Sequence, residues 1–417
     1  MREICADIVV VGGGPAGLAA ALEAKRRGVS SVLLLERDQQ LGGILQQCIH
    51  DGFGLQRFGK RLSGTQYAQA FIDEVEKTDI SVRLDTMVLE ITPDKVLYAC
   101  SRTEGMMQIR AGAIILTMGC RERTASQVFI YGERPTGVLT AGAVQRYINM
   151  EGYLPGSRAV ILGSGDIGLI MARRMTLEGM QVEGVYEVMP SPGGLTRNIV
   201  QCLEDFDIPL HLSTTVTQVH GQQRVEAVTV ARVDDNRRPI PGTERRIPCD
   251  LLVLAVGLIP ENELSRQAGI EIDPKTKGPV LDNAFMTSIP GIFAAGNVGV
   301  VFDLVDYVSR SGELAAQGAV EYLNETLDLT TPYQPVRCGE NVSFVVPQRI
   351  RPNGKPASFF LRVKAPKKKA KLCCTAGENS LYQKTRRYVA PPEMLTLEIG
   401  ACDAAPMEIS VKEVEEK

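Results

Sequence analysis

The segment Asp7-Ile-Val-Val-Val-Gly-Gly-Gly-Pro-Ala-Gly17 decides the fold of this chain. Its first half is a continuous β-branched run, which is typical of a strand buried on both faces of a parallel sheet. A glycine turn follows, then residues 18–27 have helical composition, and residues 31–35 form a second apolar run. The segment therefore predicts a strand–helix–strand unit within the first 36 residues.

The same glycine pattern, G-x-G-x-x-G, occurs twice, each time after a β-branched strand and before a helix: at Gly12, Gly14 and Gly17, and at Gly163, Gly165 and Gly168. In each case an acid, Glu36 or Glu187, ends the next strand at the spacing of a ribose contact. The first glycine permits the tight turn, the second lets backbone N–H groups approach a pyrophosphate, and the third lets the helix pack closely. The alternative is a glycine turn that only packs a helix on a sheet.

Length and segment order predict the domain organisation. At roughly 150 residues per domain, 417 residues correspond to two or three domains. The predicted fold class is α/β, with two Rossmann-like dinucleotide-binding domains and a small β-rich C-terminal domain. The first, discontinuous dinucleotide-binding domain is expected at 1–121 and 250–328, the second at 122–249, and the β-rich domain at 329–417.

Composition excludes several classes of partner and compartment. A net charge of −3, the absence of tryptophan and an aromatic content of 5% disfavour nucleic-acid binding. The basic run 364–371 lacks interleaved aromatics and is expected to be a solvated turn. The apolar stretch 8–22 is too short and too rich in glycine to span a membrane. Ten scattered cysteines indicate reduced thiols, so we expect a cytoplasmic protein.

Two dinucleotide-binding folds in one chain resemble the flavoprotein family of pyridine nucleotide-disulfide oxidoreductases, over about residues 5–323. Thr117-Met118-Gly119 and Leu254-Ala-Val-Gly257 look like the family's motifs at the two domain crossings, and Gly291-Ile-Phe-Ala-Ala-Gly-Asn297 is similar to its last FAD motif. The resemblance implies FAD on the first fold and NAD(H) on the second. Asn297 stands where an aspartate is usual, but its amide can accept and donate, so we still expect FAD to bind.

The cofactor-binding residues predicted from the fingerprints and the resemblance, for both cofactors together, are Gly12, Gly14, Pro15, Ala16, Gly17, Glu36, Arg37, Gly42, Gly43, Ile44, Gln47, Val88, Thr117, Met118, Gly119, Arg121, Gly163, Gly165, Asp166, Ile167, Gly168, Glu187, Gly257, Gly296 and Asn297. Glu187 favours NAD over NADP because a carboxylate repels a 2′-phosphate. Arg197, ten residues after Glu187, would weaken this preference for NAD.

The family's dithiol is missing, because the sequence contains neither C-x2-C nor C-x4-C. Instead, residues 42–54, 118–123, 134–138 and 303–313 look like a narrower branch of the family. That branch includes flavoprotein subunits of opine oxidases, hydrogen cyanide synthase and dye-linked proline dehydrogenases, and the flavoprotein found with anaerobic glycerol-3-phosphate dehydrogenase. The resemblance implies a subunit that works in a hetero-oligomer beside a second dehydrogenase.

Several members of this branch carry an iron–sulfur cluster in their C-terminal region. Here that region has only Cys338, Cys373, Cys374 and Cys402, with no paired ligand spacing, so we expect no metal in this chain. If a cluster is needed, a small iron–sulfur partner protein should hold it. His211 and His220 have no ligand-spaced neighbours, which indicates structural roles.

Cys48 and His50 are the candidate catalytic residues, because by resemblance their segment runs past the flavin ring. A thiol and an imidazole there could handle protons or a flavin adduct. The alternative is that Cys48 packs as a small apolar residue and His50 hydrogen-bonds a loop carbonyl.

The sequence thus predicts an FAD-dependent oxidoreductase subunit that exchanges a hydride with NAD(H) and transfers electrons to or from a partner dehydrogenase, of the glycerol-3-phosphate dehydrogenase type. One alternative is a stand-alone NADH-dependent flavin reductase or an opine- or amine-type oxidase. Another is a non-catalytic subunit whose second fold binds a nucleotide structurally.

Overall fold

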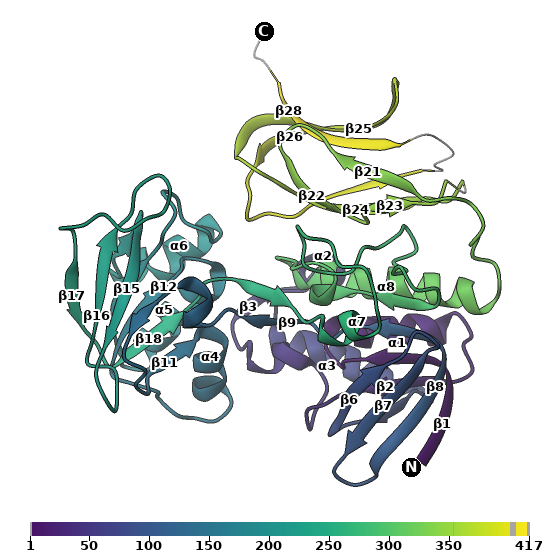
Figure 1. The fold of residues 1–417 in the computed structure, drawn as a ribbon, viewed down its shortest axis with the longest axis horizontal. Helices are drawn as coiled ribbons and strands as arrows, with labels where there is room; N and C mark the ends of the chain where they lie inside the picture. Colours follow the sequence, from purple (N-terminus) through teal and green to yellow (C-terminus); the bar gives the residue numbers. More distant parts are fainter. Residues whose placement is uncertain (1, 353, 401–405, 415–417) are drawn as a thin grey trace. The chain divides into compact units, whose positions relative to one another are not determined.

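The computed structural model describes residues 2–352, 354–400 and 406–414 (Figure 1). The chain forms two compact units. The first comprises residues 1–46, 51–120 and 260–417, and the second comprises residues 47–50 and 121–259. The four residues 47–50 therefore leave the first unit and belong to the second.

The first unit is built on a seven-stranded sheet of order β5-β2-β1-β8-β7-β6, with β20 also pairing with β8. The strands are β1 (Arg2–Val11), β2 (Val32–Leu35), β5 (Ser81–Arg83), β6 (Thr86–Ile91), β7 (Val96–Ser101), β8 (Gly105–Leu116) and β20 (Ile292–Ala294). Strands β5, β2, β1, β8 and β20 run parallel, and β6 and β7 add antiparallel pairs. The apolar run of β1 is fully buried, as the sequence predicts for a central parallel strand.

Helices pack on this sheet around the glycine turn. They are α1 (Pro15–Arg26), α2 (Leu55–Phe58), α3 (Gly64–Val75), α7 (Glu263–Gln267) and α8 (Val305–Leu323), and a short hairpin is formed by β3 (Asp51–Phe53) and β4 (Leu62–Ser63). Helix α8 crosses α1 so closely that a Cβ at Gly312 would overlap the carbonyl oxygen of Ala16. Glycine at 312 therefore brings the last long helix against the start of the first one.

The second unit contains a five-stranded parallel sheet, β11-β18-β12-β13-β14, and a four-stranded sheet, β10-β15-β16-β17. Their bounds are β11 (Val138–Thr140), β12 (Arg158–Leu162), β13 (Gln181–Tyr186), β14 (Leu210–His211), β18 (Leu251–Leu254), β10 (Tyr131–Gly132), β15 (Thr214–His220), β16 (Ala227–Arg232) and β17 (Arg245–Pro248). The helices are α4 (Ala141–Asn149), α5 (Asp166–Leu177) and α6 (Thr196–Cys202).

Strand β18 corrects the expected domain boundary at residue 250. Its residues pair with β12 on one side and β11 on the other, so β18 is a central strand of the second unit's sheet. The chain returns to the first unit at Pro260, the last residue of β19 (Leu258–Pro260), which pairs with β9 (Cys120–Glu122). The apolar run 251–254 alone could not show which parallel sheet it completes.

The C-terminal part of the first unit is β-rich, as predicted. Its two sheets have the orders β23-β21-β28-β25-β26 and β22-β24-β27. The strands are β21 (Gln334–Cys338), β22 (Val342–Val346), β23 (Arg349–Ile350), β24 (Ala357–Val363), β25 (Lys367–Ala376), β26 (Asn379–Val389), β27 (Leu395–Ile399) and β28 (Met407–Glu413). A separate apolar core that includes Phe359, Leu372 and Ile409 lies within this region.

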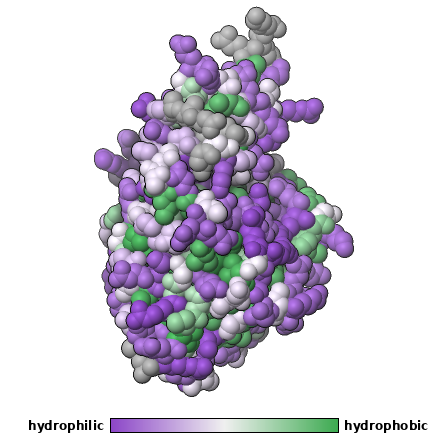
Figure 2. Space-filling view, turned by 90° about the vertical axis from the view of Figure 1, so that its right-hand side faces the viewer, coloured by the Kyte–Doolittle hydropathy of each residue, from purple (hydrophilic) through white to green (hydrophobic). Residues whose placement is uncertain are grey.

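The basic run 364–371 is a turn only at its start, because Lys367 begins strand β25. Within the strand, Lys371 lies between buried Ala370 and Leu372, and the Lys367 ammonium pairs with Glu340 and Glu413. On the face shown in Figure 2, apolar residues form small groups among polar and charged ones. None of the described helices is both long and apolar enough to cross a membrane.

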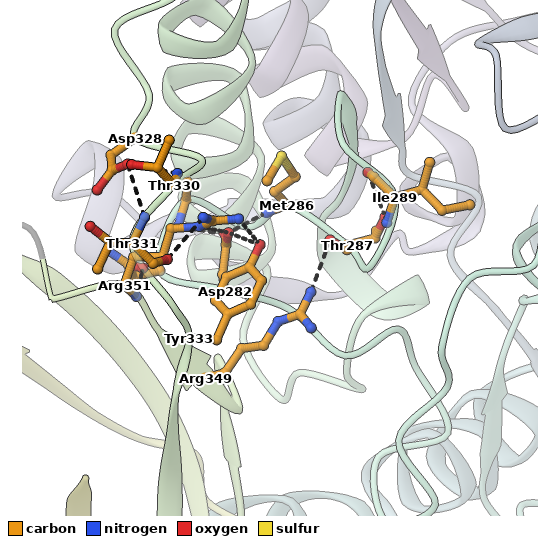
Figure 3. Close-up of polar contacts among 12 residues, drawn as sticks. Asp282, Met286, Thr287, Ile289, Asp328, Thr330, Thr331, Tyr333, Arg349 and Arg351 are labelled. Atoms are coloured by element: carbon orange, nitrogen blue, oxygen red, sulfur yellow. Dashed lines mark hydrogen bonds and ion pairs between the residues drawn. The ribbon is translucent and has the colours of Figure 1, made fainter. Parts of the chain in front are cut away.

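A buried polar cluster joins the β-rich region to the rest of the first unit (Figure 3). The ring of Tyr333 lies between the guanidinium groups of Arg349 and Arg351, at 3.9 and 4.0 Å from the ring centre. The Tyr333 hydroxyl donates to Asp282 at 3.1 Å and accepts from Arg351 at 2.5 Å. Asp282, which is 1% exposed, also accepts the backbone N–H groups of Ala284 and Met286 at 2.9 Å.

Replacing Tyr333 with leucine should lower the free energy of unfolding by about 2–3 kcal/mol, because both cation–π contacts and the hydrogen bond to buried Asp282 are lost. Tyr333→Phe, which keeps the ring between the arginines, should cost about 1 kcal/mol. Urea denaturation followed by circular dichroism measures both. Equal losses for the two variants would show that the cation–π sandwich contributes nothing.

Candidate cofactor sites

The first glycine turn, between β1 and α1, is shaped by backbone contacts that exclude side chains. Gly12 has φ +108°, and a Cβ there would lie 2.6 Å from the carbonyl oxygen of Thr117. A Cβ at Gly17 would overlap the carbonyl oxygen of Gly12. The Thr117 hydroxyl donates to the carbonyl oxygens of Val11 and Gly12, at 2.8 and 2.9 Å. Thr117 thus fixes the end of the strand from which the turn starts.

Gly14 differs from its two partners. Apart from Gly14 itself and its two chain neighbours, no atom of the described chain lies within 4 Å of the position that its Cβ would take, and its backbone is extended, with φ −75° and ψ −174°. Gly14 is also the residue that precedes helix α1, whose first N–H groups carry partial positive charge. The lack of a side chain at Gly14 therefore leaves space beside the start of α1. A pyrophosphate has the charge and the size to fill this space.

Glu36, which is 6% exposed, binds the glycine turn itself. One carboxylate oxygen accepts the N–H of Gly13 at 2.6 Å, and the other accepts the N–H of Asp38 at 2.8 Å. The sequence predicted Glu36 only as a ribose ligand. The structure adds a second role, in which the acid joins the turn to the end of β2.

Several predicted residues meet around this turn. The Gly42 N–H donates to the Gly13 carbonyl at 2.8 Å, and a Cβ at Gly43 would lie 3.1 Å from the Cα of Gly14. A Cβ at Gly296 would lie 2.8 Å from that of Ala16, in the first turn of α1 after Pro15. Segments distant in sequence thus approach the same glycine turn and leave no room for larger residues.

Both polar atoms of the Asn297 side-chain amide form hydrogen bonds. Its Oδ1 accepts the N–H of Phe302 at 3.0 Å, and its Nδ2 donates to Cys120 Sγ at 3.5 Å. Cys120 follows Met118 and Gly119, so Asn297 lies beside the predicted crossing motif. An aspartate could accept the first of these bonds but could not donate the second, which gives this position a reason to carry an amide.

Five predicted residues are not joined to the first glycine turn by these contacts. Arg37 and Ile44 are exposed, with Ile44 59% exposed, and Val88 is buried on β6, which begins beside Glu36. Gln47 and Arg121 belong to the second unit. Their places depend on long-range packing that the sequence pattern does not encode.

The second glycine turn repeats the construction of the first. A Cβ at Gly163, where φ is +100°, would overlap the carbonyl oxygen of Ala255, and a Cβ at Gly168 would lie 2.6 Å from the carbonyl oxygen of Gly163. Nothing lies within 4 Å of the Cβ position of Gly165, whose backbone is extended, with φ −64° and ψ 161°. The second unit therefore offers the same open approach in front of a helix, here α5.

Glu187, 8% exposed, repeats the role of Glu36 in the second unit. One of its oxygens accepts the Ser164 N–H at 2.9 Å and the Ser164 hydroxyl at 2.7 Å, and the other accepts the N–H of Met189 at 2.9 Å. Both units thus use the acid after the second strand to hold the residue between the first two fingerprint glycines.

A segment that the sequence did not predict, a loop leading into the first turn of α6, completes the second turn. Gly193 N–H donates to the Ser164 hydroxyl at 2.8 Å, and Asp166 accepts the N–H of Leu195 at 2.8 Å and the side chain of Asn198 at 2.6 Å. Asp166 was predicted to touch the cofactor, but its described contacts hold this loop. Ile167 packs on the apolar core of the unit, and Gly257 has φ +100° and accepts the N–H of Arg123.

Cys48 lies in a buried polar cluster in which residues 47 and 48 pack against helix α4. Gln47 donates to the Gly142 carbonyl and to Gln145 Oε1, both at 2.9 Å, and Asn149 donates to the Gln47 carbonyl at 2.8 Å. Cys48 Sγ lies 3.9 Å from the same Gln145 oxygen. Burial raises the pKa of the Cys48 thiol to about 12, so this thiol is protonated at neutral pH. His50 closes the segment and is half-buried.

The described C-terminal cysteines are not arranged as a metal site. Cys373 and Cys374 are consecutive in β25 and therefore point to opposite faces, and Cys374 belongs to the core of the β-rich region. Cys402 lies outside the described residues. Within the ranges that the structure describes, no three His, Cys, Asp or Glu side chains are arranged to hold a metal ion.

Comparisons with known proteins agree with this construction. The chain is 29% identical over 329 residues to the hydrogen cyanide synthase subunit HcnB of Pseudomonas protegens, covering 74% of this chain and 67% of the relative. It is 26% identical to one of the opine oxidase subunits of Agrobacterium tumefaciens, covering 75% and 65%. The chain thus spans about two thirds of the length of these relatives.

Among solved structures, T. acidophilum thioredoxin reductase has the same two-domain fold, with a TM-score of 0.61, 24% identity, and coverage of 78% of this chain and 100% of the reductase. The model of the pyridine nucleotide-disulphide oxidoreductase family matches residues 6–318, so the predicted family and fold class are confirmed. The chain belongs to the pyridine nucleotide-disulphide oxidoreductase family and is a flavoprotein oxidoreductase with FAD and NAD(P) as its cofactors.

Proposed function

We propose that this chain is the FAD-containing subunit of a hetero-oligomeric oxidoreductase, exchanges a hydride with NAD(H), and transfers electrons to or from a partner dehydrogenase. One observation carries the proposal: both units build the same glycine turn, with an open middle glycine before a helix, while the sequence contains neither C-x2-C nor C-x4-C. Bound FAD and NAD(H) would supply the hydride chemistry, and the protein would supply orientation and exclusion of water.

The first turn would hold FAD and the second NAD(H). In each, the helix N-terminus and the N–H groups around Gly14 or Gly165 would bind a pyrophosphate. Glu36 and Glu187 have unused lone pairs on the oxygens that already hold the turns, so each could also accept a ribose hydroxyl. In this arrangement one acid both shapes the turn and recognises the nucleotide.

The second site should prefer NADH to NADPH, because the Glu187 carboxylate would repel a 2′-phosphate. We expect kcat/KM for flavin reduction to be at least about tenfold higher with NADH. Stopped-flow measurement of the flavin absorbance with each nucleotide tests this expectation. A higher kcat/KM with NADPH would instead assign exposed Arg197 to the 2′-phosphate.

Cys48 is better explained as a packed thiol than as a redox group. Its pKa of about 12 leaves almost no thiolate at neutral pH, and the thiolate is the reactive form. Cys48→Ser should change the rate of flavin reduction by less than about threefold. Cys249→Ser, another buried thiol of the second unit, is the matched control. A large loss confined to Cys48→Ser would restore the thiol to the mechanism.

A partner is proposed because the electrons need an exit other than a dithiol. The similarity to named subunits of hydrogen cyanide synthase and opine oxidase supports a hetero-oligomer. A dehydrogenase of the glycerol-3-phosphate type is the companion that we propose, with any iron–sulfur cluster held by a further small protein. Substrate oxidation that requires a co-purified second polypeptide would support this proposal.

The similarity to opine oxidase also favours one second candidate, an opine- or amine-type oxidase function. An activity assay of the purified chain without other polypeptides distinguishes this oxidase function from the subunit function. If it oxidises an opine or a secondary amine without another polypeptide, the stand-alone function is correct.

A further inference from the structure

The second unit contains a hollow of about 580 Å³ that is lined by no residue of the glycine turn 163–168. It lies where the core between the unit's two sheets ends, and it is lined by residues from the end of β14 and from β15, β16 and β17. Its volume falls within the range of small-molecule sites, roughly 300–1,000 Å³.

Two arginines point into this hollow. Val230 belongs to the core between the sheets, and Arg232 is two residues further along β16, on the same face. Arg245 is the cross-strand partner of Val230 and shares that face. Arg232 and Arg245 are therefore diagonal cross-strand neighbours, and strand geometry places their Cα atoms about 7–8 Å apart. This spacing suits a single anionic group bound between the two side chains.

The charges of these arginines are not neutralised by the protein. No ion pair in the described ranges engages Arg232 or Arg245, although both are at the mouth of a hollow. Glu244 also lines the hollow, and it precedes Arg245 in the loop before β17. Two cations against one carboxylate leave a net positive charge, which favours an anionic ligand.

One side of the hollow carries an aromatic surface. The His211 ring stacks on buried Tyr186, with ring centres 4.7 Å apart and planes 21° from parallel. Burial and the nearby Arg245 charge lower the pKa of His211, which keeps the imidazole neutral at pH 7. Thr214 and Thr243 also line the hollow, and their hydroxyls donate to the backbone carbonyls of Leu212 and Ile240 at 2.9 and 2.7 Å.

An inward-pointing charge on an edge strand can serve only to prevent edge-to-edge pairing. This explanation fits Arg245, because β17 is the edge of its sheet. It does not fit Arg232, because the Arg232 N–H donates to Thr243 Oγ1 and its carbonyl oxygen accepts the N–H of Ile240, so the backbone there is not an open sheet edge. A binding role accounts for both arginines.

We propose that this hollow binds a phosphate-bearing small molecule, with the phosphoryl group between Arg232 and Arg245. Its lining contains no residue of the glycine turn 163–168, although the backbone of Glu187 bonds to His211 and Thr214, and the inference goes beyond the proposed function. Two sources share this chemistry, the free phosphate ion and an organic phosphate with a ring that stacks near His211.

Isothermal titration calorimetry with inorganic phosphate and with AMP tests the proposal, using FAD-loaded protein saturated with NAD+ and, in parallel, the Gly165→Val protein. Arg232→Gln and Arg245→Gln should each weaken binding about tenfold. Arg246→Gln, the exposed neighbour on the other face of β17, should change it less than about twofold. Arg245→Lys should lose less than Arg245→Gln, because it keeps the charge.

The variants also distinguish the two sources. If His211→Ala weakens AMP binding and leaves phosphate binding unchanged, the ligand is a ringed organic phosphate; if AMP binds no more tightly than phosphate, it is the free ion. No binding by the wild-type protein, or equal binding by Arg232→Gln, Arg245→Gln and Arg246→Gln, overturns the proposal. Because the Gly165→Val protein lacks the dinucleotide approach, this result does not depend on whether NAD binds.

Discussion

Replacing Gly165 with valine should abolish reduction of the flavin by NADH while the flavin stays bound. The backbone at 165 is extended, which valine adopts readily, and nothing in the described chain lies within 4 Å of the new Cβ. The side chain would instead fill the space in front of α5 that the pyrophosphate needs. Losing two hydrogen bonds to a charged group corresponds to at least about a hundredfold in affinity.

Stopped-flow reduction at a fixed NADH concentration measures this effect, and the flavin spectrum checks that FAD is retained. Gly400→Val is the matched control, because Gly400 also has open space at its Cβ and lies in the β-rich region of the first unit. Wild-type reduction rates in Gly165→Val would exclude the second glycine turn as the nucleotide site.

Gly14→Val should give a folded protein without flavin, whereas Gly12→Val should fail to fold. Gly14 has an extended backbone and open space at its Cβ, so valine blocks only the cofactor. Gly12 has φ +108°, and its Cβ would clash with the Thr117 carbonyl in the middle of the sheet. We expect FAD affinity to fall by at least about a hundredfold in Gly14→Val.

The absorbance of the purified protein near the flavin bands measures retained FAD, and circular dichroism reports folding. Thermal unfolding of Gly14→Val should match that of wild-type protein stripped of FAD. A yellow Gly14→Val protein would contradict the site, and a well-folded Gly12→Val protein would contradict the account of the turn.

Local patterns were sufficient to predict the strand–turn–helix units. The β-branched runs became β1 and β12, and the helices begin at Pro15 and Asp166, directly after the second glycine of each fingerprint. Strand β18 shows the limit of such patterns. An apolar run of four residues carries no mark of its partner strands, so its place between β11 and β12 became evident only in the folded sheet.

In the candidate cofactor sites, too, the spacing of residues was predictable from the sequence and their tertiary contacts were not. The spacing of Glu36 and Glu187 was readable, because the spacing follows from the length of one helix and one strand. Their hydrogen bonds to Gly13 and Ser164 were not, since these depend on how the turn is closed. The segment 193–198, a loop that runs into the first turn of α6, carries only a glycine pair as a signal, and Gln47 is placed by its contacts with α4, 95 or more residues away.

Reduction of the flavin by NADH tests the central claim most directly. Purified FAD-loaded protein should be titrated with NADH under anaerobic conditions while the oxidised flavin absorbance is followed. We predict that this absorbance is lost on addition of about one equivalent of NADH, because one hydride carries the two electrons that FAD accepts. A flavin that stays oxidised in excess NADH would contradict hydride exchange at this protein and leave the second turn as a structural nucleotide site.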